Sequence, residues 1–194
     1  MAFDISELSA SISRYGIQRA THYSSLITLP SVLGSNTIAS ELPLRINSMN
    51  TPGTNFGTDE IKHKGFGLNE KRPVSVTFDD INLTIIADGQ GRISNMLQQW
   101  VDLIFPSNIQ TSDAENVEYF EYPNNYYGGL EIYIYDSTGN IHTTYNFVQP
   151  FLTHLGSIEM SWETTDTLLL LPVSFTFRSV IKNSNFSGQL NSNR

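Results

Sequence analysis

The sequence predicts a mainly β fold in which one amphipathic helix packs on a sheet. Between Val74 and Ile85 apolar and polar residues alternate, and the apolar phase slips by one residue at Asp79-Asp80, as at a bulge or strand junction. The next stretch has apolar residues at three- and four-residue spacing, which places on one helical stripe Ile93, Met96, Leu97, Trp100, Val101 and Ile104. Most of the remaining chain has strand patterns, so this helix has a sheet to pack against.

A short N-terminal helix is expected before the first strand. Asp4 and Glu7 have the spacing of a capping box. Apolar residues then follow at helical spacing up to about Gly16, namely Ile5, Leu8, Ile12 and Tyr15. The run from Tyr23 to Leu29 predicts the first strand, which Pro30 ends.

Residues 30–73 are the least regular part of the chain and hold four of its eight prolines together with several glycines. The alternating Leu42, Leu44 and Ile46 predict one further strand. From Asn50 to Gly67 we expect a long loop or extended hairpin. Long insertions of this kind are commonly functional, so we expect it to contact a partner subunit.

The second half of the chain predicts antiparallel strands. The alternation in residues 130–135 and 141–147, on either side of a Gly-containing turn, is typical of a hairpin. Two further strands are expected at 158–162 and 169–177. Because proline cannot donate to a strand ladder, Pro172 predicts an edge or bulged position for the last of these.

These patterns predict one domain over residues 1–180, with an extended loop at 47–72 and a polar C-terminal tail at 181–194. A chain of 194 residues is long enough for one sizeable core and short for two. No stretch approaches the roughly 20 apolar residues that span a bilayer, and the N-terminus lacks the pattern of a signal peptide. We expect neither secretion by a signal peptide nor a membrane anchor.

Charge and cysteine content exclude several kinds of function. Charged residues make up 15% of the chain, against about 25% in average soluble domains. The formal net charge of −8 argues against tight, nonspecific nucleic-acid binding, which needs lysine and arginine to displace counterions from phosphate. With no cysteine, the chain can form neither disulfides nor thiolate metal sites.

No residue pattern predicts catalysis, so we expect no enzyme activity, no cofactor and no metal. The four histidines, at positions 22, 63, 142 and 154, are not paired at metal-ligand spacing. Asp79 and Asp80 are interpreted as a solvated bulge, since adjacent strand residues point to opposite faces. The glycines at 65–67 and 89–91 are interpreted as loop closures, although the second pair leaves a weak anion site open. No Gly-x-Ser-x-Gly elbow occurs.

A basic cluster lies within the expected long loop of this otherwise acidic chain, formed by Lys62, His63, Lys64, Lys71 and Arg72. It could be a nucleic-acid patch, but it lacks the interleaved aromatic residues of single-strand binders. It could also be simply solvated. We favour charge complementarity with the acidic loop of the next subunit, which has no lysine or arginine between residues 107 and 125 and carries Asp113, Glu115, Glu118 and Glu121.

Several segments resemble the tail tube proteins of contractile-tailed bacteriophages. The most specific is Lys71-Arg72-Pro73-Val74-Ser75-Val76-Thr77-Phe78-Asp79-Asp80-Ile81-Asn82-Leu83-Thr84-Ile85, followed by a helix that contains Gln99-Trp100-Val101. Residues 151–162 are similar to the family's segment between its last two hairpins, and residues 173–177 to its final strand. The family usually has tryptophan or tyrosine where this chain has Phe151. The resemblance covers most of residues 23–180.

The resemblance implies an antiparallel β-sandwich or barrel with one flanking helix, six copies per ring, and rings stacked into a hollow tail tube that carries DNA. The implied partners are further copies, the tail sheath, baseplate and tail terminator proteins, with phage DNA as transient cargo. The expected location is the virion, after assembly in the host cytoplasm. Acidic residues that face the channel would repel DNA phosphate.

Two alternatives remain open. A baseplate tube initiator, or the tube of a related injection device, would share the fold. A carbohydrate-binding β-sandwich could instead use Tyr126, Tyr127, Tyr133 and Tyr135, although such tyrosines also serve in cross-strand packing.

Overall fold

The computed structural model describes residues 5–34, 40–61, 69–105, 120–158 and 167–184. Its first half contains α1 (Ile5–Tyr15), β1 (Tyr23–Thr28), η1 (Ser31–Leu33), η2 (Leu42–Arg45), β2 (Ile46–Met49), β3 (Thr54–Ile61), β4 (Glu70–Phe78) and β5 (Ile81–Ile86). Its second half contains α3 (Arg92–Ile104), α4 (Pro123–Tyr126), β6 (Gly129–Tyr135), β7 (Ile141–Val148), β8 (Phe151–Leu155), β9 (Leu170–Thr176) and β10 (Ser179–Ser184).

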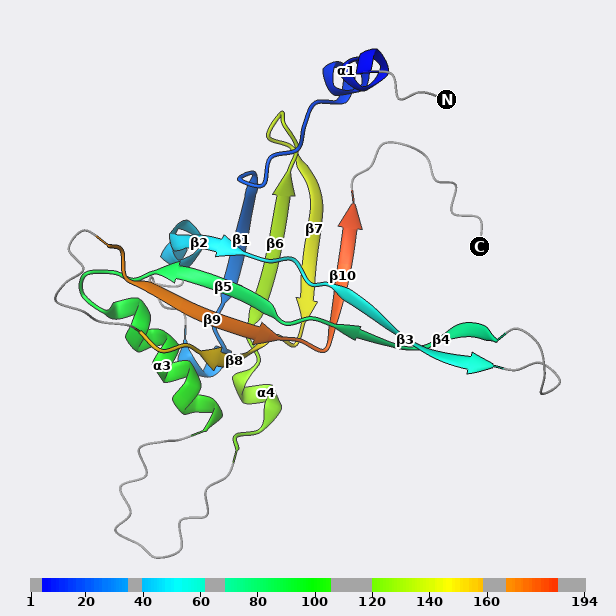
Figure 1. The fold of residues 1–194 in the computed structure, drawn as a ribbon. Coiled ribbons are helices and arrows are strands. Elements are labelled where there is room, and N and C mark those ends of the chain that lie inside the picture. The colour runs from blue at the N-terminus through cyan, green and yellow to red at the C-terminus, as the bar shows by residue number, and fades with distance from the viewer. Residues whose placement is uncertain (1–4, 35–39, 62–68, 106–119, 159–166, 185–194) are drawn as a thin grey trace, which may run out of the picture.

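Two antiparallel sheets form a sandwich. The strand order is β1-β6-β7-β10 in the first sheet, here called sheet A, and β2-β5-β9-β8 in the second, sheet B. Figure 1 shows the strands of one sheet crossing those of the other, with the ribbon of β3 and β4 projecting to one side. The mainly β prediction with one flanking helix and a short N-terminal helix is confirmed.

The core lies between the two sheets and is closed by α3. The predicted helix forms, and four of its six apolar residues are buried: Ile93, Met96, Leu97 and Trp100. Trp100 is fully buried, with its ring 5.4 Å from that of Phe175 on β9. Its indole Nε1 donates a hydrogen bond to the Tyr126 carbonyl at 3.0 Å. This bond satisfies the one polar atom of a large apolar side chain.

Close packing around Trp100 explains one glycine. A Cβ on Gly128 would lie 2.6 Å from the Thr28 carbonyl oxygen and 2.6 Å from the indole ring. Backbone cannot move aside cheaply, so only glycine fits where β6 begins.

Several other elements match their predictions. Helix α1 ends at Tyr15. The next residue, Gly16, has a φ of 72°, which suits the position after a helix, and its amide donates to the Ile12 carbonyl. The capping residue Asp4 lies outside the described residues. Strands β6 and β7 form the predicted hairpin. Strands β3 and β4 pair as a hairpin, although its second strand, Glu70–Phe78, lies beyond the range 50–67 in which a long loop or extended hairpin was predicted.

Residues 42–46 were predicted as one strand, which is wrong. Leu42–Arg45 form a 3-10 helix, with Pro43 in its first turn, and the strand starts only at Ile46. Proline fixes φ near −65°, a value that suits the first turn of a helix.

Pro172 was predicted at an edge or bulge, but β9 lies between β5 and β8. The Gly156 amide, just beyond the end of β8, donates to the Pro172 carbonyl at 2.8 Å. Since the N–H and C=O of one strand residue point the same way, the donor that proline lacks faces the side where β8 has already ended. Pro172 therefore removes no hydrogen bond between β9 and β8.

Two strands were not predicted. Strand β8 pairs with β9 through a register shift between Leu152 and His154, and β10 pairs with β7. Strand β10 includes residues 181–184, which were expected in the polar tail. Residues 185–194, and 159–162 of the strand expected at 158–162, lie outside the described part.

Replacing Trp100 by alanine should remove the centre of the core. We expect Trp100→Ala to lower the free energy of unfolding by about 3–5 kcal/mol, measured by urea denaturation. Leu44→Ala is the control, because Leu44 is 86% exposed and should change that free energy by less than about 0.5 kcal/mol. Equal losses in both variants would contradict this description of the core.

Candidate subunit interface

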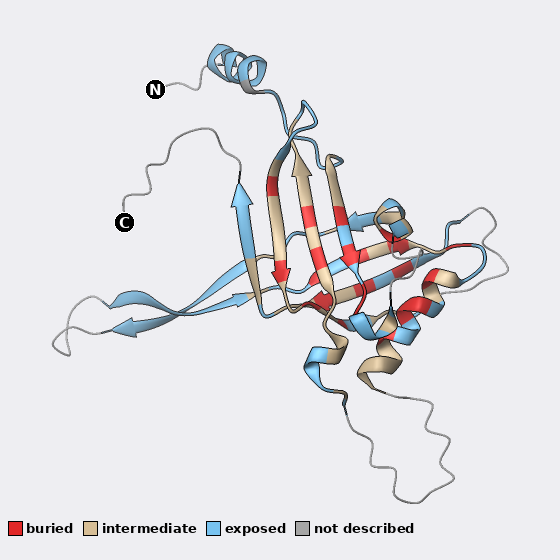
Figure 2. Ribbon diagram, turned by 180° about the vertical axis from the view of Figure 1, so that it is seen from behind, coloured by how far each residue is buried: buried red, intermediate tan, exposed pale blue. Residues whose placement is uncertain are grey.

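The ribbon of β3 and β4 lies outside the sandwich and buries almost nothing. Every residue of β3 is exposed, as are all residues of β4 before Phe78, and Figure 2 shows the ribbon extending away from the core. An isolated two-stranded ribbon is marginally stable in water. The exposed ribbon is therefore a candidate contact surface.

The ribbon has one apolar face. Phe56 pairs with Val76 across the two strands, and their side chains are 62% and 51% exposed. Val74, beside a register shift, is exposed as well. The opposite face is polar, where Asn55 pairs with Thr77. We call Phe56, Val74 and Val76 the apolar row.

The root of the ribbon is fixed to the sandwich. The Phe78 ring lies 5.8 Å from that of Phe177. Asn55 Nδ2 donates to Asp79 Oδ1 at 2.7 Å, and the Asp79 amide bonds the Gly53 carbonyl. Asp79 and Asp80 are both exposed, as expected for a solvated junction. The ribbon is thus held in one direction at its base.

The charges near the tip of the ribbon pair with one another. Lys71 Nζ lies 3.7 Å from Glu60 Oε1 across the two strands. Arg72 makes a forked contact to Glu70, with Nε and Nη2 each 3.1 Å from a carboxylate oxygen. These exposed pairs add little stability. They nevertheless offset the positive charge of Lys71 and Arg72 within their own hairpin.

The predicted contact between the basic cluster and the acidic loop of the next subunit is not tested by the structure of a single chain. Lys62, Lys64, Asp113, Glu115 and Glu118 lie outside the described residues. Glu121 has a local role, because its carboxylate accepts from Asn125 Nδ2 at 2.7 Å and from the Tyr122 amide at 3.0 Å. It fixes the chain just before α4.

Sheet A has an open edge, whereas the edges of sheet B are protected. In sheet B the outer strand β2 is short and has a register shift, and α3 packs against β8. Short, bulged or covered edges prevent unwanted strand pairing. In sheet A, β1 contacts η2, but no described strand pairs with the outer side of β10. Sequence reasoning missed this edge because it missed β10.

Helix α1 exposes its apolar stripe. Ile5, Leu8 and Ile12 are all exposed, Ile5 at 75%. Isolated helices of fewer than about 12–15 residues are marginal in water, and α1 has 11 residues. It is a further candidate contact surface.

The loop before α3 is not an anion site, because the chain fills it. The Ile93 amide donates to Asp88 Oδ1 at 3.0 Å, and Arg92 Nε donates to Asp88 Oδ2 at 3.0 Å. The backbone bond from Ile93, with the contacts of Arg92, lowers the pKa of Asp88 below its usual value. The interpretation of residues 89–91 as a loop closure agrees with this geometry.

The four tyrosines considered for carbohydrate binding are engaged within the chain, and all are only partly exposed. Tyr126 and Tyr127 pack against Phe151, with ring centroids 5.3 Å and 6.1 Å from it. The Tyr135 hydroxyl bonds Ser24 Oγ at 2.8 Å, and the Tyr133 hydroxyl donates to Glu131. Only the contact of Tyr135 with Ser24 joins two paired strands, β6 and β1, so the tyrosines serve packing and local hydrogen bonds of several kinds.

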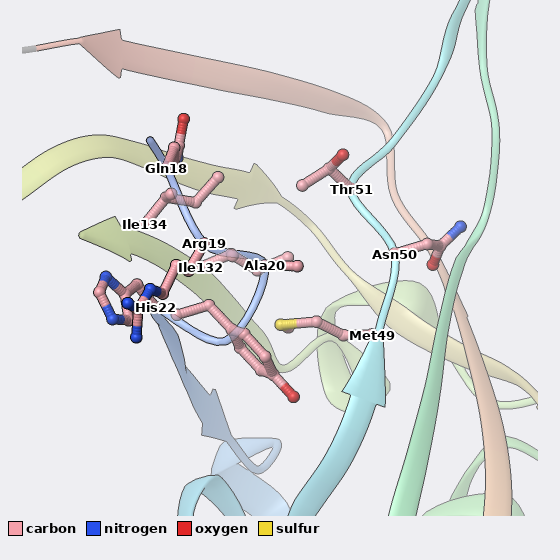
Figure 3. Close-up of a pocket in the computed structure, with 10 residues that line it drawn as sticks. Gln18, Arg19, Ala20, His22, Met49, Asn50, Thr51, Ile132 and Ile134 are labelled. Atoms are coloured by element: carbon pink, nitrogen blue, oxygen red, sulfur yellow. The ribbon is translucent and has the colours of Figure 1, made fainter. Parts of the chain in front are cut away.

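A cavity of about 560 Å³ opens where the two sheets diverge. Figure 3 shows Ile132 and Ile134 of β6 facing Met49 of β2, with the segment before β1 at its rim. At that rim, His22 Nδ1 lies 3.2 Å from the Asp136 carbonyl oxygen.

Among the described residues no group of three or more His, Cys, Asp or Glu could hold a metal. Nor does any described helix combine the length and apolarity that a bilayer crossing requires.

The fold matches solved structures at low sequence identity. One is the sheath-tube complex of the PVC extracellular contractile injection system in its extended state: TM-score 0.58, 15% identity, 91% of this chain and 97% of that chain covered. Another is the anti-feeding prophage cap: TM-score 0.59, 16% identity, 87% and 91% covered. These likenesses concern the fold alone.

Sequence comparison gives a family. No curated protein matches the chain. The family described as "Phage tail tube protein" matches residues 9–183, a span that includes every strand of both sheets except the last residue of β10.

Asp88 should make the stability of the fold depend on pH. A carboxylate with a lowered pKa in the folded state stabilises it above the unfolded pKa, and this contribution is lost as pH falls through the folded value. We expect Asp88→Asn to lower the melting temperature at pH 7. The difference from the unmodified protein should shrink below the ordinary aspartate pKa of 3.8.

Thermal melts of both proteins from pH 7 to pH 2 measure this convergence. A difference that stays constant over the whole range would show that the charge of Asp88 does not fix the start of α3.

Proposed function

Because the chain belongs to the phage tail tube protein family, we propose that six copies form a ring and that stacked rings form the hollow tube through which DNA passes. The chain is a structural protein of the phage tail. The ring, its six copies, the passage of DNA and assembly in the host cytoplasm are all parts of this proposal.

The observation that carries the proposal is the open edge of sheet A. An exposed edge strand presents unpaired backbone N–H and C=O groups, which favour pairing with another chain. Closure of such sheets into one barrel removes every edge. Since the edges of sheet B are short or covered, we assign sheet A to the channel wall, with β10 paired to the neighbouring copy.

The ribbon supplies a second contact. Its apolar row needs burial against another copy, and its fixed root gives it one direction. Lys62, Lys64, Lys71 and Arg72 remain proposed partners of the acidic loop of a neighbour. Because Lys71 and Arg72 are already paired within the ribbon, we assign most of the contact energy to the apolar row.

Other partners are proposed from the names of similar structures. One is a sheath/tube terminator of an injection system, with TM-score 0.57 and 15% identity. We propose corresponding partners here: the tail sheath, the baseplate and a tail terminator. We expect no catalytic turnover.

Electron microscopy tests the assembly directly. Negative-stain images of the purified chain over a concentration series should show hollow rings or tubes with six-fold symmetry. Particles that remain monomeric at every concentration, also when seeded with fragments of tail tube, would contradict the proposal.

Charge on the apolar row should prevent assembly without unfolding the chain. We expect Val76→Lys to abolish tube formation, because a buried lysine in the contact would lack a partner. Since Val76 is exposed in the single chain, its unfolding free energy should change by less than about 0.5 kcal/mol.

Thr77→Lys is the matched control, because Thr77 is the next residue and lies on the polar face. It should assemble normally, as scored by sedimentation. Equal assembly of both variants would exclude the apolar row as a contact.

A further inference from the structure

The outer faces of the two sheets carry almost no charge. Outward-facing residues of sheet A form rows across the strands, the central ones being Leu26, Glu131, Asn146 and Ile181, and Ser24, Tyr133, Thr144 and Asn183. The strands of both sheets contain two charged residues, Glu131 and Lys182. Lys182 shares its face with the inward-facing Tyr145, and its Nζ lies 5.5 Å from the centre of that ring.

Glu131 is therefore the single charged side chain on either outer sheet face of the described part. It is also tied down, because the Tyr133 hydroxyl, two residues along the same strand, donates a hydrogen bond to its carboxylate. That bond raises the pKa of Tyr133, so the hydroxyl keeps its proton. The remaining outward residues of sheet A carry hydroxyl, amide or apolar groups, apart from the imidazole of His142, whose Nδ1 lies 2.8 Å from Thr143 Oγ1 near the end of the sheet.

We propose that this outer face of sheet A is a non-binding wall for double-stranded DNA, which lets phosphate pass because it offers no cation rather than because it repels. The inference rests on the proposed function, which places sheet A at the channel. Phosphate affinity comes mainly from lysine and arginine, and the face has neither. One hydrogen-bonded carboxylate per copy is a weak source of repulsion, since charges are screened within about 8 Å at physiological salt.

The repulsive account makes the opposite claim about Glu131. If the acidic net charge of the chain kept DNA from sticking, loss of this carboxylate would remove the one anionic group in the strands of sheets A and B. If the wall merely lacks cations, that loss changes little, and only an added cation creates binding. Glu131→Gln and Glu131→Lys separate the two accounts.

The experiment uses tubes assembled in the presence of a short duplex DNA, then washed and sedimented. Glu131→Gln tubes should retain DNA within about twofold of unmodified tubes. Glu131→Lys tubes should retain on the order of tenfold more, and added salt should reverse this retention. Asp102→Lys makes the same charge change on α3, away from sheet A, and should behave as unmodified tubes.

Each outcome has one meaning. Retention by Glu131→Gln that equals Glu131→Lys would establish repulsion and overturn the inference. Equal retention by Glu131→Lys and Asp102→Lys would overturn it as well, because DNA would not meet this face. Thr144→Lys, on the same face beside Tyr133, replaces Glu131→Lys if that variant does not assemble. Failure of the unmodified chain to form rings would instead overturn the proposed function.

Discussion

The unpaired backbone of β10 is the constraint on which the arrangement of this protein depends. A strand edge must be covered, twisted away or paired, and the chain protects the edges of sheet B but leaves β10 open. The ribbon is exposed in a similar way. The backbones of β3 and β4 hydrogen-bond to each other, yet the side chains of the apolar row remain exposed to water. Both features are costly in a monomer and useful in a polymer. We therefore explain the exposed surfaces of this chain by assembly rather than by ligand binding.

The core holds these exposed surfaces in a fixed arrangement. Trp100 of α3, buried against Phe175 of β9, holds the helix against the sheets, and Asp88 fixes the start of the same helix. A well-packed interior keeps β10 and the root of the ribbon in fixed directions relative to each other. Rigid surfaces lose less entropy when copies associate. Among the strands of the two sheets, Glu131 is the one charged residue on an outer face, so the proposed channel wall and the proposed subunit contacts use different residues.

The sequence predicted correctly those elements in which apolar residues recur with the regular spacing of a helix or a strand. The stripe of α3 and the alternation of β6 and β7 were clear because one face of each is buried. Strand β8 was missed because a register shift near Thr153 breaks its alternation, and β10 because an exposed edge strand has no apolar period to read. The candidate contact residues depend on register: nothing in the spacing of Lys71 and Glu60 shows that they face each other across two strands. The family resemblance alone implied a tube, whereas the exposed surfaces that could form subunit contacts were recognised only from the structure.

Hydrogen exchange before and after assembly tests the central claim most directly. The claim is that polymerisation covers the open edge of sheet A. Amides of β10 that do not bond to β7 should exchange rapidly in the free chain and slowly in tubes, whereas amides of α3, bonded within the helix, should be protected in both. Equally fast exchange of the β10 edge in free chain and tube would contradict the account.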